Sequence, residues 1–394
     1  MAKRATKKKT AAKKKSAAKS EPKIYKGLAG VVTDVTAVSK VMPETNSLTY
    51  RGYAVQDLAA SCSFEEVAYL ILMGDLPNRR QLNAFKKKER GLRKLSKAHI
   101  DVISKFPRKA HPMDTIQASL AYLGTTEVAW GGESLEDDME RAINMLAKLP
   151  TMVATDFRFR QGKRRIAPRT DLSYAENFFN MCFGTIPPKE VIRAFDVSLI
   201  LYAEHSFNAS TFTGRVIAST RSDIYSSVAG AIGALKGPLH GGANEAVMEM
   251  MKKVRTPKNA EPFLRKAFAN KDLVMGFGHR VYKQGDSRVP TMKACLEDLT
   301  RWSGDTRWLD IYNIMADIMV NEKGIHPNLD FPSGPAYYLM GFPINLYTPI
   351  FVMARITGWA AHYFEQNANN SLIRPLSHYN GRAQRKVPPI AKRK

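Results

Sequence analysis

The sequence predicts an all-α fold. Apolar residues recur at helical spacing over several segments, and small or turn-forming residues mark the ends of these segments. Alternating strand–helix units and a phosphate-loop motif are both missing, which disfavours a doubly wound parallel sheet. With 394 residues, 44% of them hydrophobic, the chain is long enough to bury a substantial core. We therefore expect a globular helical protein.

The expected elements can be placed in chain order. Short β-like alternation over residues 30–41 predicts one or two strands. Ser63 and Glu66 have capping-box spacing, and Gly74 ends the apolar segment that follows, so a helix is expected over 64–74. Further helices are expected over 190–205, 224–235, 243–254, 311–320 and 349–364.

The first 22 residues form a low-complexity Lys/Ala segment. The chain carries a formal net charge of +24; residues 1–20 hold nine basic residues and no acidic one, so the remainder still carries +15. With almost nothing apolar to bury, residues 1–22 are predicted to be disordered. They are either a solubilising tail or a non-specific phosphate-binding arm that contacts nucleic acid. A second short basic tail is expected over 385–394.

Targeting signals and the number of cysteines indicate the cellular location to expect for the protein. No apolar run reaches 18 residues, and no apolar region follows the basic N-terminus, so neither a membrane span nor a secretory signal is expected. Three scattered cysteines fit reduced thiols and argue against a disulfide framework or a zinc site. A cytoplasmic protein without a metal is the expectation.

Two glycine-rich segments each carry a histidine in a marked setting. His240 lies in KGPLHGGAN, directly before an expected helix, whose N-terminal partial charge disfavours a proton on the imidazole. A neutral ring there can donate a hydrogen bond to an enolising carbonyl, although a histidine in an ordinary tight turn is an equal reading. His279 lies in MGFGHRVYK, where two glycines let the backbone approach a ligand closely.

Three further segments place charge among apolar residues. Asp330 lies in HPNLDFPSG, where an ordinary loop aspartate is the default interpretation. His205 follows an apolar helix. Arg355 interrupts PIFVMARITGWAA, and because a guanidinium stays charged when buried, a carboxylate partner is expected for it.

Taken in order, these segments resemble the citrate synthase family. The similarity runs from GLAGVVTDVT near Gly27 to IRPLSHYNG near Gly381, and GPLHGGAN, GFGHRVYK and PNLDFPSG are specific in combination. The resemblance implies an acyltransferase that condenses an acyl-CoA with oxaloacetate. One departure is Ser287, where the family often has proline between Asp286 and Arg288.

The resemblance also implies roles for individual residues. Asp330 would remove a proton from the acyl-CoA methyl group, His240 would stabilise the enolate, and His279 would polarise the ketone. Oxaloacetate is expected to be held by His205, Arg288, Arg355 and Arg374, whose side chains suit two carboxylates. Asn208 and Phe351 are also expected at the substrate site, with the Phe351 ring beside the reacting centre. The positions expected near CoA are Gly276, Phe277, Gly278, Lys283 and Asn328.

The implied architecture has two helical domains. The large domain would comprise 23–241 and 341–384, with a small domain, 242–340, inserted between them. The resemblance further implies a homodimer in which Arg374 enters the neighbouring active site, and no cofactor beyond acetyl-CoA or propionyl-CoA as substrate. Acetyl-CoA is the preferred donor; 2-methylcitrate synthase activity with propionyl-CoA is the alternative. A rival of another class is a basic nucleic-acid-binding protein on an inactive enzyme fold.

Overall fold

The computed structural model describes residues 23–126, 134–279, 281–282 and 285–393. The predicted disorder and nucleic-acid contact of residues 1–22 lie outside these ranges, as does Lys283. The described chain divides into two units, Thr36–Ile373 and a second one formed by the remaining terminal residues up to Val35 and from Arg374 onward. The large and small domains predicted within 23–384 stay a prediction.

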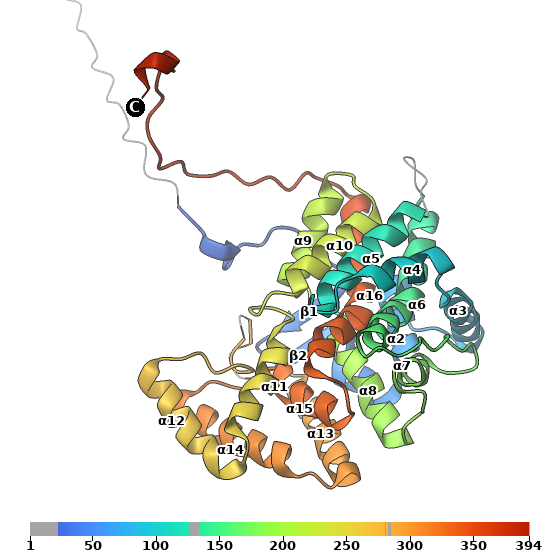
Figure 1. The fold of residues 1–394 in the computed structure, drawn as a ribbon. Helices are drawn as coiled ribbons and strands as arrows, with labels where there is room; N and C mark the ends of the chain where they lie inside the picture. Colours follow the sequence, from blue (N-terminus) through green and yellow to red (C-terminus); the bar gives the residue numbers. More distant parts are fainter. Residues whose placement is uncertain (1–22, 127–133, 280, 283–284, 394) are drawn as a thin grey trace, which may run out of the picture. The chain divides into compact units, whose positions relative to one another are not determined.

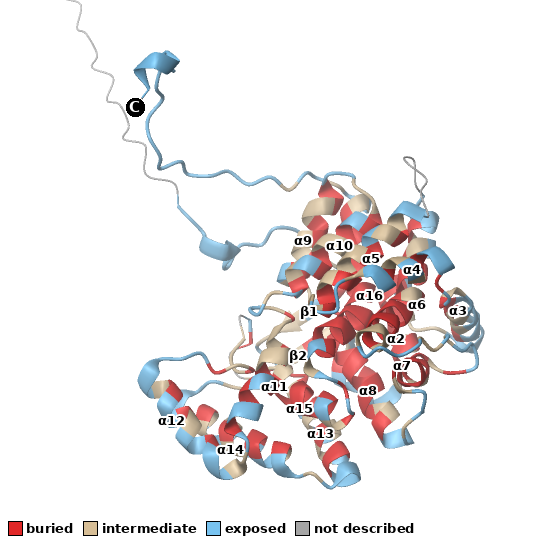
Figure 2. Cartoon of the chain, viewed as in Figure 1, coloured by how far each residue is buried: buried red, intermediate tan, exposed pale blue. Residues whose placement is uncertain are grey.

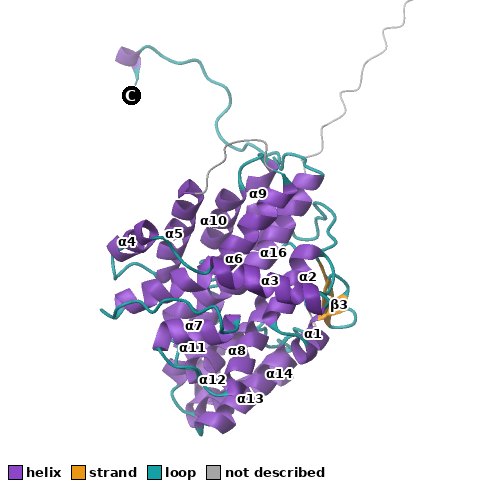
Figure 3. Ribbon diagram, turned by 90° about the vertical axis from the view of Figure 1, so that its right-hand side faces the viewer, coloured by secondary structure: helices purple, strands orange, loops and turns teal. Residues whose placement is uncertain are grey.

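The all-α prediction is confirmed: helices dominate the described residues, and the strands form one small sheet (Figure 3). The first eight helices are α1 (Val55–Ser61), α2 (Phe64–Met73), α3 (Arg79–Leu92), α4 (Lys97–Lys105), α5 (Pro112–Thr126), α6 (Leu135–Arg160), α7 (Tyr174–Phe183) and α8 (Lys189–Tyr202). The others are α9 (Ala209–Ser219), α10 (Ile224–Leu235), α11 (Ala243–Val254), α12 (Ala260–Asn270), α13 (Val289–Ser303), α14 (Arg307–Lys323), α15 (Asp330–Leu339) and α16 (Tyr347–Ala368). Short 3₁₀ turns are η1 (Lys26–Leu28), η2 (Pro257–Asn259), η3 (Ile344–Leu346) and η4 (Ile390–Lys392).

The sheet is antiparallel, with strand order β1 (Ser39–Met42), β2 (Ser47–Tyr50) and β3 (Tyr53–Ala54). Ser39 pairs with Tyr50, and Thr49 pairs with Ala54. The strand prediction over 30–41 was therefore wrong before Ser39. Residues 30–38 belong to no strand of the described chain, and Val32 and Val35 are exposed there.

Local sequence signals placed several helices correctly. The Ser63–Glu66 capping box begins α2, and Gly74 ends it at φ +98°, a left-handed conformation that glycine adopts without a steric penalty. α10 and α11 match their expected bounds. α8 ends at Tyr202 instead of continuing to residue 205. Long-range donors take its last carbonyls: the Tyr50 hydroxyl binds the carbonyl oxygens of Ile200 and Leu201 at 3.1 and 3.3 Å.

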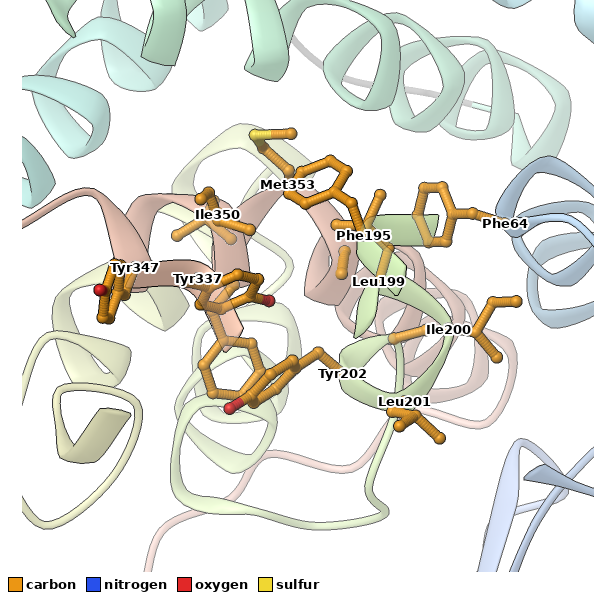
Figure 4. Packing of buried hydrophobic residues seen from close by; sticks show 14 of the residues in the cluster. Phe64, Phe195, Leu199, Ile200, Leu201, Tyr202, Tyr337, Tyr347, Ile350 and Met353 are labelled. Carbon is orange, nitrogen blue, oxygen red and sulfur yellow. The ribbon is translucent and has the colours of Figure 1, made fainter. Parts of the chain in front are cut away.

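Helix α16 lies at the centre of the core and packs against α2, α6, α8, α9 and α10 (Figures 1 and 2). Around the junction of α8, α15 and α16, aromatic and aliphatic side chains such as Phe195, Tyr337 and Ile350 interdigitate (Figure 4). α11, α13 and α15 pack together and join this core through α8. The last turn of α8 therefore meets helices from distant parts of the chain.

No single helix among the described residues is long and apolar enough to cross a bilayer. Asp330–Leu339 and Ile344–Ala368 meet the length and composition test only as a pair bent by 117°, and most residues of both segments are buried in the core.

Candidate active site

The candidate site is built around the C-terminal end of α8. A helix leaves its last carbonyl groups without intrahelical partners, and this end carries partial negative charge. Arg355 Nε donates to the carbonyl oxygen of Tyr202 at 2.7 Å, and Arg288 Nη1 donates to that of Leu201 at 3.4 Å. The helix end thus holds two buried guanidinium groups close together.

Arg288 is fixed by a bidentate ion pair. Its Nε and Nη2 donate to the two carboxylate oxygens of Asp286 at 2.9 and 2.7 Å. Asp286 also accepts the backbone N–H of Leu329 at 3.2 Å, which ties this loop to the start of α15. Burial acts to raise the pKa of Asp286, but the charge of Arg288 and the hydrogen bonds from Arg288 together outweigh burial, so the pKa is lowered. Where the family often has proline, the Ser287 hydroxyl lies 3.1 Å from that of Tyr282.

Arg355 lacks the carboxylate contact that the sequence led us to expect. It is 1% exposed, and no ion pair links it to a carboxylate of the described residues. Burial lowers its pKa to about 10, and the charge of Glu204 opposes that shift without a direct contact. Glu204 Oε1 is instead taken by His362 Nε2 at 2.8 Å and the Ser39 hydroxyl at 2.9 Å. The expectation failed because the end of α8 supplies a carbonyl acceptor.

His205 and His279 lie side by side, with ring centroids 5.1 Å apart. Burial, followed by the charges of Arg288 and His279, holds the pKa of His205 well below its ordinary value, so its ring is neutral. His279 Nδ1 accepts the backbone N–H groups of Val281 and Tyr282 at 3.0 and 3.1 Å. In neutral His279 the proton is therefore on Nε2.

Two buried nitrogen atoms of this cluster lack hydrogen-bond partners among the described residues: Arg355 Nη1 and His205 Nε2. Buried polar atoms are nearly always paired, so each such exception calls for an explanation. Together with the guanidinium group of Arg288, they form a positively charged cluster suited to a small anion with carboxylate acceptors.

His240 is held in the turn before α11. Its Nε2 lies 2.8 Å from the Ser210 hydroxyl, which also accepts the indole N–H of Trp359 at 3.1 Å. Burial, with a smaller effect from Arg355, lowers the pKa of His240 to about 3. The ring is neutral, and burial with the charge of Arg355 accounts for the lowered pKa. Because the Ser210 hydroxyl donates its one hydrogen to Asn208 Oδ1 at 2.8 Å, it accepts from His240 Nε2, so the proton of the neutral ring is on Nε2 in this arrangement. Turning the Ser210 hydroxyl toward Nε2 would place the ring proton on Nδ1.

Asp330 begins α15 and is half-buried. The Tyr202 hydroxyl donates to its Oδ1 at 2.7 Å, and its backbone N–H is held by Asn328 Oδ1 at 3.1 Å. Burial raises the pKa of Asp330 to about 6, against the opposing effect of the Tyr202 hydrogen bond. A carboxylate with that pKa is a competent proton acceptor near neutral pH.

The Phe351 ring connects these groups. Its centroid lies 4.2 Å from that of Tyr202, 4.7 Å from Arg355 Cζ and 6.4 Å from that of His240. The structure therefore brings His240, Arg355 and the Tyr202–Asp330 pair to one aromatic ring. His279 joins the same region through His205 and Arg288, so residues far apart in sequence share one site.

Asn208 forms hydrogen bonds to neighbouring residues of the chain. It caps α9, where its Oδ1 accepts the backbone N–H of Thr211 at 3.1 Å and the Ser210 hydroxyl at 2.8 Å. It therefore positions the serine that contacts His240. Arg374 belongs to the other unit of the chain and is exposed.

The segment expected near CoA pairs with the loop before Asp330. Phe277 and Pro327 form an antiparallel bridge, the N–H of Asn328 donates to the carbonyl oxygen of Gly276 at 2.9 Å, and Asn328 Nδ2 donates to that of Gly278 at 3.0 Å. Beside this bridge is a cavity of about 170 Å³, whose lining includes Gly278 and His279. The pairing holds His279 and Asp330 on adjoining strands of backbone.

Gly276 should tolerate no side chain. Its φ is +84°, and a Cβ would lie 2.8 Å from Val247 Cγ2 and 2.9 Å from Phe331 Cβ. We expect Gly276→Ala to lower the free energy of unfolding by about 2–4 kcal/mol through overpacking and backbone strain. Gly304→Ala is the matched control: φ is +73° but nothing lies within 4 Å, so about 1 kcal/mol is expected. Urea denaturation of both variants measures this, and equal losses would contradict the close packing at Gly276.

Sequence reasoning missed four residues of the site. Tyr202 has the spacing of an apolar core position of a helix, and Ser210 and Trp359 carry no sequence signal of a functional role. The fourth residue is Asp286. Only Asp286 could have been suspected, because a buried arginine two residues later requires a counter-charge.

The helical fold and this cluster of neutral imidazoles, a basic carboxylate and buried arginines define an acyltransferase of the carbon–carbon bond-forming kind. The model of the citrate synthase C-terminal domain family matches residues 27–376. A citrate synthase of Mycolicibacterium smegmatis is 56% identical over 93% of this chain and 97% of its own length. A 2-methylcitrate synthase of Mycobacterium tuberculosis is also 56% identical, over 93% of each chain. The chain belongs to the citrate synthase family.

Solved structures of citrate synthases have the same fold as this chain. Citrate synthase of Thermoplasma acidophilum, in a ternary complex with carboxymethyl coenzyme A and oxaloacetate, superimposes with a TM-score of 0.89 at 35% identity. That match covers 94% of this chain and 100% of the other. The enzyme of Thermotoga maritima gives 0.86 at 37% identity, with the same coverage.

Proposed function

We propose that this chain condenses acetyl-CoA with oxaloacetate and water to give citrate and CoA. The observation that carries the proposal is the cluster of Arg288, Arg355 and His205, in which Arg355 Nη1 and His205 Nε2 are buried without partners among the described residues, near the half-buried Asp330. A dicarboxylate bound there accepts from Arg355 Nη1 and, with the proton of the neutral ring on Nε2, from His205, and it offers its ketone to the neighbouring His279. Bidentate and charge-assisted donors suit this ligand.

The three catalytic groups are proposed to act in sequence. Asp330 takes a proton from the acyl methyl group. Neutral His240, with the Ser210 hydroxyl turned from Asn208 to donate to Nε2 and the ring proton on Nδ1, donates a hydrogen bond to the thioester oxygen as charge develops on it. His279, with its proton on Nε2, polarises the ketone and protonates the new alkoxide. Hydrolysis of the resulting thioester releases CoA. The paired backbone of Gly276–Gly278 and Asn328, with Phe277, supports the CoA, together with Lys283.

The choice between acetyl-CoA and propionyl-CoA does not follow from the relatives, because a citrate synthase and a 2-methylcitrate synthase are equally similar to this chain. The Tyr202 and Phe351 rings are buried and in contact beside Asp330, which favours a small acyl group. One methylene is worth about 1–3 kcal/mol in an apolar pocket. We expect kcat/KM, measured by thiol release, to be about tenfold higher for acetyl-CoA than for propionyl-CoA. A reversed ratio would make the chain a 2-methylcitrate synthase.

We also propose a homodimer in which Arg374 completes the partner's oxaloacetate site. Its position in the family resemblance and its exposure support this. Arg374→Ala and Asp330→Asn protomers, each nearly inactive alone, should regain about a quarter of wild-type activity after mixing and refolding, because one site of each hybrid dimer is intact. If Arg374 acts within its own chain, the hybrid still has one protomer lacking Arg374 and one lacking Asp330, so mixing should restore nothing.

A further inference from the structure

Tyr202 makes three contacts within the site. It is the last residue of α8 and is 2% exposed. Its hydroxyl donates to Asp330 Oδ1 at 2.7 Å, its ring packs on Phe351 at 4.2 Å, and its carbonyl oxygen accepts Arg355 Nε at 2.7 Å. The hydroxyl and ring contacts come from α15 and α16 and the backbone contact from α16, so the tyrosine side chain has little freedom to turn away from the carboxylate.

The hydroxyl contact has two consequences for Asp330. It occupies Oδ1, so Oδ2 is the oxygen left to accept a proton from a ligand. It also favours the charged carboxylate, because a donor to an ionised group stabilises that form. Of the groups acting on Asp330, Tyr202, Arg288 and Arg355 lower its pKa, while burial and the charge of Asp286 raise it. Tyr202 has the largest lowering effect.

Tyr202 cannot readily give up its own proton. Burial, with the neighbouring charge of Asp330, keeps the pKa of Tyr202 well above its ordinary value. It therefore remains a hydrogen-bond donor over the whole range in which the enzyme works, and it does not compete with Asp330 as a base.

We propose that Tyr202 is the positioning residue of the proton-abstraction step, holding Asp330 ionised and oriented with Oδ2 toward the acyl donor; this rests on the proposed function. In that step the proton passes from the acyl α-carbon to Oδ2. The C–H electron pair becomes the enolate double bond, and the carbonyl π pair moves to the thioester oxygen, where His240 donates. Tyr202 exchanges no atom or electron with the substrate.

The test is Tyr202→Phe, which keeps the ring and removes the hydroxyl. We expect kcat to fall about tenfold or more, since a hydrogen bond to a charged group is lost. The acid limb of the kcat profile should move up by about one pH unit, and KM for oxaloacetate should change less than about twofold. Tyr337→Phe is the control: Tyr337 is an equally buried tyrosine on α15, but its hydroxyl donates to Ser198 Oγ at 3.1 Å. Its acid limb should stay in place.

A lower kcat without a displaced acid limb would reduce Tyr202 to packing and overturn the inference while leaving the proposed function intact. If the wild-type enzyme released no CoA with either acyl donor, the proposed function itself would fall. The inference is then decided by ¹³C NMR titration of the Asp330 carboxyl carbon, assigned by its loss in Asp330→Asn. Tyr202→Phe should raise this pKa, and an unchanged value contradicts the proposal.

Discussion

Asp330→Asn should lower kcat about a thousandfold, because a positioned general base contributes about 10²–10⁴. The substitution keeps the shape of the side chain and its place at the start of α15 but leaves no basic oxygen beside the acyl methyl group. Oxaloacetate should still bind, because its proposed donors are untouched. Isothermal titration with oxaloacetate and thiol release with acetyl-CoA separate these two effects.

The same carboxylate sets the expected pH dependence. Because burial raises the pKa of Asp330 from 3.8 to about 6, the base is present above that value and is lost as the pH falls through it. The kcat profile of the wild-type enzyme should therefore have an acid limb centred near pH 6. His240, whose pKa is about 3, stays neutral across this range and adds no limb.

Asp310 provides the control, since it lies in the first turn of α14 and is exposed. Asp310→Asn should keep both the wild-type rate and the acid limb. Retention of more than about a tenth of the rate by Asp330→Asn would show that another group removes the proton.

Arg355→Met should raise KM for oxaloacetate by about a hundredfold or more, because truncating one partner of a buried charged contact costs about 2–5 kcal/mol. The same change removes a buried charge that has no ion pair among the described residues, and methionine is of similar length. The substitution removes the desolvation penalty of this buried charge, which offsets the lost hydrogen bond to the carbonyl oxygen of Tyr202. The unliganded variant should therefore melt no lower than the wild type, while losing the rise in Tm that oxaloacetate gives.

Arg215 is the matched control for this prediction. It is also buried, but it forms an ion pair with Glu365 at 3.5 Å and stacks on Phe207 at 4.5 Å. Arg215→Met should lower the free energy of unfolding by about 2 kcal/mol, because it leaves Glu365 without this partner. Differential scanning fluorimetry with and without oxaloacetate reads both effects. Equal destabilisation by the two substitutions would contradict the view that Arg355 is held uncompensated for a ligand.

The helices were largely predictable because their signals are local. The capping box at Ser63 and the small-residue segment that became α10 depend only on neighbouring residues. The C-terminal end of α8 was not predictable, since Tyr50 and Arg288 donate hydrogen bonds to its last carbonyl groups from distant parts of the chain. Local alternation likewise failed over 30–38, because a strand also needs a partner and a covered face.

The candidate site could be predicted only from the combination of three segments that resembles a known family. Taken singly, His240 in a tight turn and Asp330 in a loop have ordinary structural interpretations. The structure brings their segments together, and the catalytic roles stay a proposal. Tyr202 was not predictable, because its periodicity is that of a core residue and its function depends on a hydroxyl meeting a carboxylate 128 positions away. The prediction of a carboxylate partner for Arg355 was wrong for a related reason: its acceptor is a backbone carbonyl group, which residue types do not reveal.

The most direct measurement is a crystal structure of this protein with oxaloacetate and carboxymethyl coenzyme A. We predict that oxaloacetate carboxylates bind Arg355 Nη1 and His205 Nε2 beside Arg288, with the ketone at His279. The carboxymethyl group, standing in for the enolised acyl group, should lie between His240 and the Asp330 carboxylate. A complex in which the carboxymethyl end lies away from both residues, or in which oxaloacetate leaves those two donors unpaired, would contradict the account.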